Sequence, residues 1–385
     1  MSRDYDVIIA GFGLSGMTIV YEMSKLKGFA EKSILVIDSD KKNKNDRTWS
    51  FWSNEKTEYE AMACKTWDKC FFYSENGDCL DLDLGDYRYY TIRGIDFYEF
   101  IFDKLQGFTN ITFLTEQIEE VSDEGYVKTA SGKYTADRVC RSYFDKNELE
   151  SVFKSDFIWQ HFKGWYIETK NDAFEENCFT VMDYRVSAAG KIDFFYVLPF
   201  TKNTALVEFT EFSREFYEQS EYDDKIKSYI KNTLKIDDYT VSEEEFNAIP
   251  MTSAKLKPVK NKLINVGTVA GYVKPSSGYA FTRIVKNSKT VAKSIMEGSK
   301  IQSRPKYAFF YRLMDSTLLE VFDRNPDTSK RFYYSLFKKL KAYEIFGFLD
   351  EKSSFPKISK VFLSAADYAF TFIVAMLTSF YKRLS

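Results

Sequence analysis

Residues 4–16, DYDVIIAGFGLSG, decide the fold together with residues 33–38, SILVID. Each stretch contains a short apolar run that is typical of a buried strand. Residues 17–26, which lie between them, are helix-forming and place their apolar side chains on one face. Because the second strand ends in Asp38, the order is strand, glycine-rich turn, helix, strand and acid. The sequence therefore predicts a Rossmann-like α/β domain that binds a dinucleotide.

The GxGxxG pattern supplies the first candidate cofactor-binding residues. Its glycines allow a tight turn, close approach of the backbone to a pyrophosphate, and close helix–strand packing, and the helix N-terminus directs free N–H groups toward the phosphates. The acid at the end of the second strand is placed to accept a hydrogen bond from a ribose hydroxyl. The candidates are Gly11, Phe12, Gly13, Leu14, Ser15, Gly16 and Asp38. Because the pattern occurs once, at the start of the sequence, we expect FAD rather than NAD as the resident cofactor; the alternative is an accidental glycine-rich turn.

A second glycine-bearing loop, residues 266–279 (VGTVAGYVKPSSGY), lies between a predicted strand at 262–266 and a predicted helix at 281–297. Small residues before a helix N-terminus let backbone amides approach a polar or anionic cofactor. The candidate cofactor contacts are Gly267, Gly271, Pro275 and Gly278, and Tyr279 is a substrate or structural candidate. The alternative is a glycine-rich surface loop. Two such strand–loop–helix segments predict one discontinuous domain that grips the cofactor from both sides.

Between these segments the sequence becomes rich in β-branched and aromatic residues, which favour strands. Four antiparallel strands are expected at residues 164–169, 178–186, 192–198 and 205–212. Residues 214–247 read as charged and helical with a solvated face, and the chain beyond residue 300 reads as helical. We therefore predict a dinucleotide domain at residues 1–150 and 255–300, a β-sheet substrate or cap domain at 151–254, and a C-terminal helical region at 301–385.

Composition excludes several classes of function. The 54 basic and 56 acidic side chains give a net charge of −2, so nucleic acid is not an expected partner. The single histidine, His161, excludes a metal site that needs two imidazoles, and no metal is expected. The five cysteines are odd in number and form no CxxC pair, which favours a reduced, cytoplasmic chain without structural zinc.

The longest apolar stretch lies near the C-terminus, at residues 361–381. Asp367 is its only charged residue, and Lys382 and Arg383 follow it directly. Its uncharged part is too short to span about 30 Å of hydrocarbon comfortably. Two interpretations remain open: a helix that is buried in the protein, or a helix that dips into a membrane interface.

Several blocks of sequence, taken together, resemble the lycopene β-cyclases of carotenoid biosynthesis. They follow one another in the same order from residue 5 to about residue 290, and the most specific are the block at residues 45–52 and the block at 195–200 with 207–213. The blocks are residues 11–16 with Asp38, residues 45–52 (NDRTWSFW), residues 182–185 (MDYR), residues 195–200 (FYVLPF) with 207–213 (VEFTEFS), Ile249-Pro250, and the 266–279 loop.

This resemblance implies a flavoprotein fold of the flavin monooxygenase/reductase type, with an antiparallel substrate sheet and C-terminal helices. It implies FAD that is active in its reduced form, with NADPH or NADH as the reductant. The implied reaction is an isomerisation, or intramolecular lyase reaction, without net redox change: the acyclic ends of lycopene or a related acyclic carotenoid close to β-ionone rings. Because such a substrate resides in the bilayer, the resemblance also implies peripheral, monotopic contact with a membrane surface.

The resemblance places the acid–base glutamate of the family on Glu208. In a strand at 205–212 this residue shares one face with Leu206 and Thr210. A carboxyl group among apolar side chains has a raised pKa, and it can be protonated near neutral pH and donate its proton. The alternative is that Glu208 lies on the solvent face of an ordinary strand. Glu211 would face the other way, which makes it the weaker candidate, and Phe209 stands where a second acid is common in the family.

Five further residues are candidates for supporting roles. Asp183 and Arg185 share one face of their predicted strand, either as a structural ion pair or as a pair near the substrate. Arg47, with Trp49 close by, is placed for flavin or phosphate contact, and Arg93 precedes a predicted helix that could face the cofactor.

Two other functions remain as alternatives. The first is a redox flavoenzyme, a reductase or hydroxylase, that acts on a long apolar isoprenoid. Flavin hydroxylases of similar architecture usually carry Asp where this chain has Thr268, which argues against the hydroxylase. The second alternative is a protein that binds carotenoid or flavin without turnover.

Overall fold

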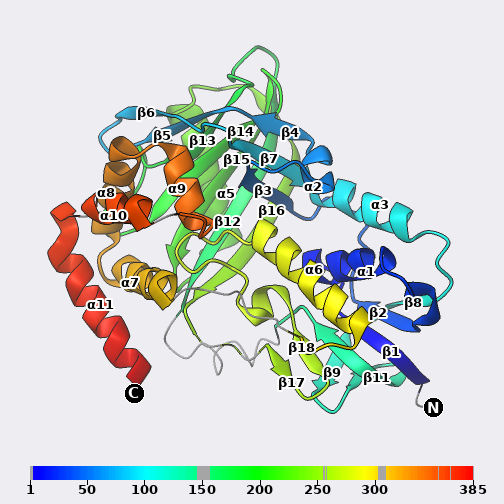
Figure 1. Ribbon diagram of the computed structural model, residues 1–385. Coiled ribbons are helices and arrows are strands. Elements are labelled where there is room, and N and C mark those ends of the chain that lie inside the picture. Colours follow the sequence, from blue (N-terminus) through cyan, green and yellow to red (C-terminus); the bar gives the residue numbers. More distant parts are fainter. Residues whose placement is uncertain are drawn as a thin grey trace. The chain divides into compact units, whose positions relative to one another are not determined.

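The computed structural model describes residues 3–144, 157–254, 256, 258–301, 309–353, 355–364 and 366–384. The chain forms two compact units (Figure 1). The first comprises Met1–Asn45, Gly94–Asp156 and Thr252–Lys306, and the second Asp46–Arg93, Phe157–Met251 and Tyr307–Ser385. This division differs from the predicted domains, because residues 46–93 and the helices after residue 306 group with the large antiparallel sheet.

The first unit is built on a sheet of eight strands. Its centre is β1 (Arg3–Ala10), which pairs in parallel with β2 (Ile34–Asp38) and β11 (Gly132–Arg141). Further parallel pairs add β8 (Ile111–Thr115) beside β2 and β18 (Leu263–Asn265) beside β11. The remaining strands, all paired antiparallel, are β9 (Ile118–Ser122), β10 (Tyr126–Thr129) and β17 (Val259–Lys260). The predicted strand–turn–helix–strand segment is confirmed, and its apolar runs are buried as expected for parallel strands.

Helices cover this sheet. The helix after the glycine-rich turn is α1 (Leu14–Ser24), and it packs against α6 (Phe281–Glu297) and α3 (Gly94–Leu105). Short 3₁₀ turns occupy Phe29–Glu31 and Gly267–Ala270. The α1–α6 contact joins the two ends of the discontinuous unit, and it brings the two glycine-bearing loops to one side of β1.

The second unit is built on a seven-stranded sheet in the order β16-β12-β15-β14-β13-β5-β6. The four predicted strands are confirmed as β12 (Phe157–Thr169), β13 (Cys178–Asp183), β14 (Asp193–Pro199) and β15 (Thr204–Ser213). They are joined by β16 (Tyr239–Thr252) at one edge, and by β5 (Lys69–Tyr73) and β6 (Cys79–Leu82) at the other. β13 pairs in parallel with β5, whereas β12, β15, β14 and β13 pair antiparallel.

The prediction of a helix over 214–247 is correct only for α5 (Gln219–Asn232). Residues 239–247 instead belong to β16, which pairs with β12. The glutamates of this stretch favour a helix locally, but hydrogen bonding along the free edge of β12 outweighs a weak propensity. This correction matters because β16 carries a buried carboxyl group.

Smaller elements complete the second unit. A three-stranded sheet contains β3 (Thr48–Ser53), β4 (Lys65–Trp67) and β7 (Arg88–Arg93), and α2 (Glu58–Ala61) follows β3. The C-terminal part is helical, as predicted. Its helices are α7 (Phe309–Arg324), α8 (Pro326–Lys339), α9 (Ala342–Leu349), α10 (Phe355–Ser364) and α11 (Ala369–Leu384), with a 3₁₀ turn at Ala366–Tyr368.

The two faces of the seven-stranded sheet differ. α5 covers one face, where Val207 and Phe209 of β15 join a core cluster with Ile226 and Tyr229. Because side chains alternate along a strand, the residues between them point to the opposite face. Glu208 therefore lies on the face that α5 does not cover.

Candidate active site and cofactor-binding loops

In the first glycine-rich turn, two glycines have no space for a side chain and one has space in front of it. At Gly11 the φ angle is +94°, and a Cβ atom there would lie 2.5 Å from Ser142 Oγ. A Cβ atom at Gly16 would lie 2.3 Å from the carbonyl oxygen of Gly11. At Gly13, by contrast, a Cβ atom would meet nothing within 4 Å. The first and third glycines are thus required for packing, whereas the second leaves space in front of the backbone.

Asp38 stabilises this turn by accepting hydrogen bonds from the backbone. Its Oδ2 accepts a hydrogen bond of 2.6 Å from the backbone N–H of Phe12, and its Oδ1 accepts one of 2.8 Å from the N–H of Asp40. Lys42 Nζ lies 3.2 Å from Oδ1. The side chains of Phe12 and Leu14 are buried. Asp38 thus orders the glycine-rich loop, and its predicted contact with a ribose remains a prediction.

The second glycine-bearing loop contacts the first. Gly267 has a φ angle of +64°, and a Cβ atom there would lie 2.3 Å from Ser15 Oγ. Gly271 (φ +81°) and Gly278 (φ +69°) also occupy the left-handed region. The N–H of Lys274 donates to the carbonyl oxygen of Tyr279 at 2.8 Å and closes a turn around the buried Pro275. The predicted residues of the two loops therefore lie in one unit and, at Ser15 and Gly267, in direct contact.

These loops fit the pyrophosphate of a dinucleotide. Gly13 is the N-cap of α1 and makes no side-chain cap, and the first turn of α1 holds no acidic residue. Exposed N–H groups and the positive end of the helix dipole favour an anion at such a terminus. In the second loop Ser277 Oγ is buried and has no hydrogen-bond partner in the described part of the chain. A buried hydroxyl of this kind is costly unless a ligand or water satisfies it.

Glu208 lies on a face of the sheet that is rich in aromatic residues. Its register partners are Tyr196 on β14 and Gly164 on β12, and partners in antiparallel strands share a face. Thr210 Oγ1 donates to Glu208 Oε1 at 2.8 Å. Burial raises the pKa of Glu208 well above its usual value, and the neighbouring Glu245 raises it further. A raised pKa favours the protonated form of the carboxyl group, which is the form that an acid catalyst needs.

Glu245 is a functional candidate that the sequence analysis missed. It is 5% exposed and lies on β16, within hydrogen-bonding reach of Glu208. Thr48 Oγ1 donates to Glu245 Oε2 at 2.7 Å, and Tyr166 OH is hydrogen-bonded to Thr48. Burial raises the pKa of Glu245 to about 7. In the local sequence, strand-forming residues at the start of β16 favour a strand here, but the three consecutive glutamates that follow favour a helix.

Gly164 makes room for the two carboxyl groups to meet. A Cβ atom at this position would lie 2.8 Å from Leu206 Cδ1 and 3.3 Å from Glu245 Cγ. Glycine inside a strand often marks a place where another group approaches the backbone closely. Here the missing side chain lets Glu245 cross β12 toward Glu208.

Two predicted arginines are connected to this carboxyl pair, Arg93 through its strand register with Thr48 and Arg47 through its charge. Thr48 of β3 is the register partner of Arg93 of β7, and Arg93 Nη2 lies 2.6 Å from Glu243 Oε1. Arg47 donates to Asp46 through Nε at 2.9 Å, and its charge lowers the pKa of Glu245. Trp49 is the register partner of Ile92. These residues belong to the second unit, and their predicted contact with flavin or phosphate remains a prediction.

Asp183 and Arg185 form a structural ion pair. Asp183 is fully buried, and its two oxygens lie 2.9 and 3.0 Å from Arg185 Nε. Tyr229 OH of α5 donates to Asp183 Oδ2 at 2.6 Å. Because Asp183 is the register partner of Phe195, which packs under α5, the pair lies on the face opposite Glu208. The geometry supports the structural alternative.

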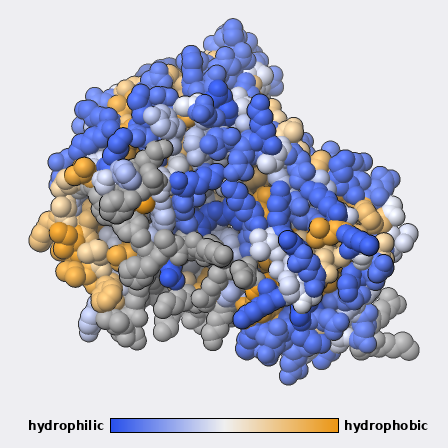
Figure 2. Space-filling view, viewed as in Figure 1, coloured by the Kyte–Doolittle hydropathy of each residue, from blue (hydrophilic) through white to orange (hydrophobic). Residues whose placement is uncertain are grey.

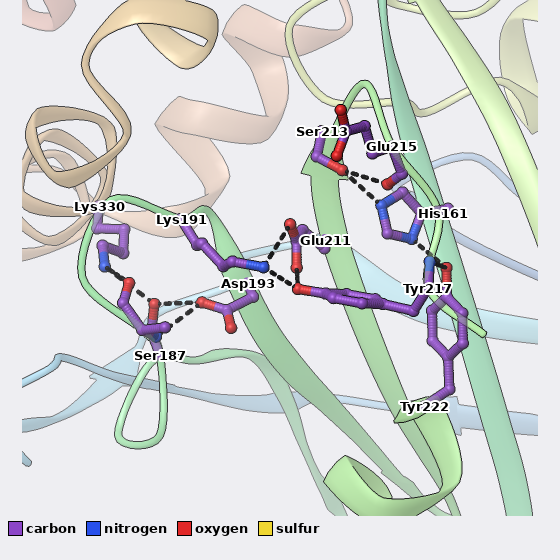
Figure 3. A network of polar contacts seen from close by, with 11 residues as sticks. His161, Ser187, Lys191, Asp193, Glu211, Ser213, Glu215, Tyr217, Tyr222 and Lys330 are labelled. Atoms are coloured by element: carbon purple, nitrogen blue, oxygen red, sulfur yellow. Dashed lines mark hydrogen bonds and ion pairs between the residues drawn. The ribbon is translucent and has the colours of Figure 1, made fainter. Parts of the chain in front are cut away.

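Glu211 and His161 belong to a separate polar network (Figure 3). Tyr217 OH donates to Glu211 Oε2 at 2.5 Å, and Lys191 Nζ lies 3.5 Å from Glu211 Oε1. His161 Nδ1 accepts from Tyr222 OH at 2.6 Å, and Ser213 is 2.8 Å from Nε2. Burial lowers the pKa of His161 to about 4. As predicted, Glu211 faces away from Glu208.

The described residues contain no group of three or more His, Cys, Asp or Glu side chains arranged to hold a metal ion. Within the same ranges, no helix combines the length and the apolar character needed to cross a membrane.

Solved structures define the class of fold. A geranylgeranyl bacteriochlorophyll reductase-like protein from Thermoplasma acidophilum superposes with a TM-score of 0.63 at 12% identity, over 98% of this chain and 100% of that chain. A flavoprotein/dehydrogenase from Cytophaga hutchinsonii gives a TM-score of 0.60 at 12% identity, over 90% and 92% of the two chains. The predicted Rossmann-like fold of the FAD-binding type is confirmed.

The sequence identifies the family within that class. The family described as lycopene cyclase protein matches residues 6–380. Lycopene beta cyclase, chloroplastic, from Nicotiana tabacum is 22% identical over 311 residues, which cover 76% of this chain and 60% of that protein. The chain thus spans less than two thirds of the length of that curated relative. This protein belongs to the lycopene cyclase protein family.

Proposed function

We propose that this protein is an FAD-dependent lycopene cyclase that closes the acyclic ends of lycopene, or of a related acyclic carotenoid, to β-ionone rings without net redox change. The observation that carries the proposal is Glu208, a carboxyl group on an aromatic face of the sheet whose pKa is raised by burial. Family membership supports the carotenoid substrate class.

In the proposed reaction Glu208 donates its proton to the terminal carbon–carbon double bond. The resulting tertiary carbocation is attacked by the neighbouring double bond, which forms the new carbon–carbon bond of a six-membered ring. A ring proton then returns to the Glu208 carboxylate and leaves the ring double bond. One proton is given and one is taken back, so the product has the mass of the substrate.

Aromatic side chains on the same face support this chemistry. Phe162 and Tyr166 on β12 and Phe194 and Tyr196 on β14 share the face of Glu208 through the strand register. An aromatic ring stabilises a nearby cation by about 0.5–2 kcal/mol. Rings that exclude water also protect the cation from hydration.

We propose that the two glycine-bearing loops hold FAD. Gly13 and the N-terminus of α1 would receive the pyrophosphate, and Ser277 would hydrogen-bond a polar group of the cofactor. When bound and reduced by NADPH or NADH, FAD supplies negative charge that favours formation of a cation.

We further propose that α11 contacts the membrane surface from which the substrate is drawn. Apolar side chains gather along α11 (Figure 2), and Phe370, Leu377 and Phe380 are 82%, 60% and 50% exposed. A helix with an exposed apolar face and no capacity to span the bilayer suits an interfacial position. Of the two interpretations of this segment, the exposed side chains favour the membrane interface over burial.

The decisive experiment is anaerobic turnover of lycopene in liposomes with FAD and NADPH, comparing the wild type with Glu208→Gln. We expect a wild-type product of unchanged mass and blue-shifted absorption, and loss of cyclisation in Glu208→Gln with flavin still bound. Glu211→Gln is the matched control, because Glu211 lies on the same strand and faces the other way. A product that is two hydrogens heavier would establish a reductase instead, and an active Glu208→Gln would remove the proposed acid.

A further inference from the structure

We propose that Glu245 is a positioning residue for the acid Glu208: the two carboxyl groups share one proton, which Glu245 and the Tyr166–Thr48 hydroxyl pair hold on Glu208 between turnovers. This inference rests on the proposed function, because it assigns to Glu245 the control of the proton that Glu208 donates. It concerns a residue on an edge strand that none of the family blocks quoted above includes.

The geometry places Glu245 beside Glu208, across Gly164. Gly164 is the register partner of Glu208, and the Glu245 side chain passes over that glycine. Glu245 is 5% exposed, whereas Glu208 is partly accessible. A substrate can therefore reach Glu208, while Glu245 is left to act through it.

The hydrogen bond from Thr48 favours the charged form of Glu245, because it lowers the pKa of that carboxyl group. Thr48 has one hydroxyl proton, and it donates that proton to Glu245 Oε2. Tyr166 OH must then be the donor to Thr48. Glu245 Oε1 is buried and has no hydrogen-bond partner in the described part of the chain, and the nearby Glu208 carboxyl group can supply the missing donor when it is protonated. In the proposed arrangement the donors run from Tyr166 through Thr48 to Glu245, and the Glu208 proton would be donated to Glu245 from the other side.

This arrangement accounts for both proton transfers. Before reaction, the anionic Glu245 keeps the proton on Glu208, because two adjacent carboxyl groups cannot both ionise easily. After Glu208 has protonated the alkene, two carboxylates stand together in a buried site. Their repulsion favours return of a proton, so the ring proton is transferred to Glu208 and the pair regains its single proton. No external acid or base is consumed.

Other ionisable groups surround the pair. Tyr196 on β14 and Tyr166 on β12 share the face of Glu208, and Glu243 on β16 and Arg47 before β3 act on Glu245 with opposite signs. Glu243 itself is paired with Arg93. Glu208 and Glu245 each affect the pKa of the other carboxyl group.

The test is the pH dependence of cyclisation in Glu245→Gln. Glutamine keeps an acceptor for Thr48 and gives Glu208 a donor, which stabilises the Glu208 carboxylate. We expect the alkaline limb of the activity profile to move to lower pH by about one unit or more. Glu243→Gln is the matched control, since it removes a carboxylate two residues away on the same strand and should move the limb much less. Thr48→Val should shift the limb in the opposite direction, because Glu245 then holds its own proton more tightly.

A second measurement does not depend on turnover. The C=O stretch of a protonated carboxyl group, read by infrared difference spectroscopy during a pH titration, should disappear in Glu208→Gln and titrate at lower pH in Glu245→Gln than in the wild type. If Glu245→Gln lowers activity while both titrations stay at the wild-type pH, Glu245 has only a structural role and the inference is wrong. If the wild type does not cyclise lycopene, the proposed function fails, and if Glu208→Gln cyclises it, the assignment of Glu208 as the acid fails, whereas an infrared shift in Glu245→Gln would still establish the shared proton.

Discussion

The backbone N–H of Phe12 donates a 2.6 Å hydrogen bond to Asp38 Oδ2, so the acid at the end of β2 fastens the turn that follows β1. A hydrogen bond to a charged group contributes about 1.5–3 kcal/mol. We expect Asp38→Ala to loosen the turn and to weaken FAD binding by roughly tenfold to a hundredfold. Titration of the apoprotein with FAD, followed by flavin fluorescence, measures this. Asp40→Ala is the control, and equal affinity of Asp38→Ala and the wild type would contradict the prediction.

Side chains of increasing size at position 164 should reduce cyclase activity stepwise. A Cβ atom at this position would already lie 2.8 Å from Leu206 Cδ1, and the larger valine side chain would also press on Glu245. Overpacking of this kind costs about 1–3 kcal/mol. We expect Gly164→Ala to retain partial cyclase activity and Gly164→Val to lose it, with flavin still bound in both. Thermal unfolding and turnover test the series, and a fully active Gly164→Val would show that Glu208 and Glu245 need no contact.

The buried pair of Asp183 and Arg185 predicts a loss of stability without a change in the pH profile of catalysis. Removing one partner of a buried ion pair costs about 3–5 kcal/mol, and Asp183→Asn leaves Arg185 and Tyr229 without their charged acceptor. Tyr229→Phe removes one hydrogen bond to the buried carboxylate and should cost about 1.5–3 kcal/mol. Urea unfolding measures both effects. A displaced pH profile in stable Asp183→Asn would instead connect the pair to the reaction.

The burial of His161 should make the stability of the folded protein sensitive to mild acid. Its pKa is lowered from 6.5 to about 4 by burial, so the unfolded chain binds the proton more readily than the folded protein. Its contribution to stability is therefore full above pH 6.5 and is lost as the pH falls toward 4. Between pH 7 and pH 5 we expect a loss of about 2 kcal/mol, which should be absent in His161→Gln. Urea unfolding at the two pH values provides the comparison, and equal losses in both proteins would refute it.

The exposed apolar face of α11 predicts how the protein binds membranes. Leu377 is 60% exposed, and burial of a leucine side chain contributes about 2 kcal/mol. We expect Leu377→Glu to reduce binding to liposomes by at least tenfold, measured by co-sedimentation. Ser220→Glu on α5 adds the same charge to another exposed helix and should have little effect. Unchanged binding of Leu377→Glu would place the contact surface elsewhere.

Local patterns were sufficient for most of the fold. Alternation of apolar residues, the glycines of residues 11–16 and the strand-forming residues of 157–213 act over a few positions. They predicted β1, α1, β2, the four antiparallel strands and α6. Glu208 was proposed from the resemblance to lycopene β-cyclases, and the period of two along a strand predicted only which residues share its face.

Other features depended on contacts between distant segments. Glu245 meets Glu208 only because β16 pairs with β12 at the sheet edge, and Gly164 leaves the space between them. Asp183 and Glu208 lie on opposite faces because the register between β13 and β14 is irregular. Local sequence patterns were enough to predict most strands and turns, and the family resemblance proposed Glu208 as the acid. Only the tertiary structure decided which second carboxyl group stands beside it, because side-chain pairing across a sheet depends on strand order and register rather than on local propensity.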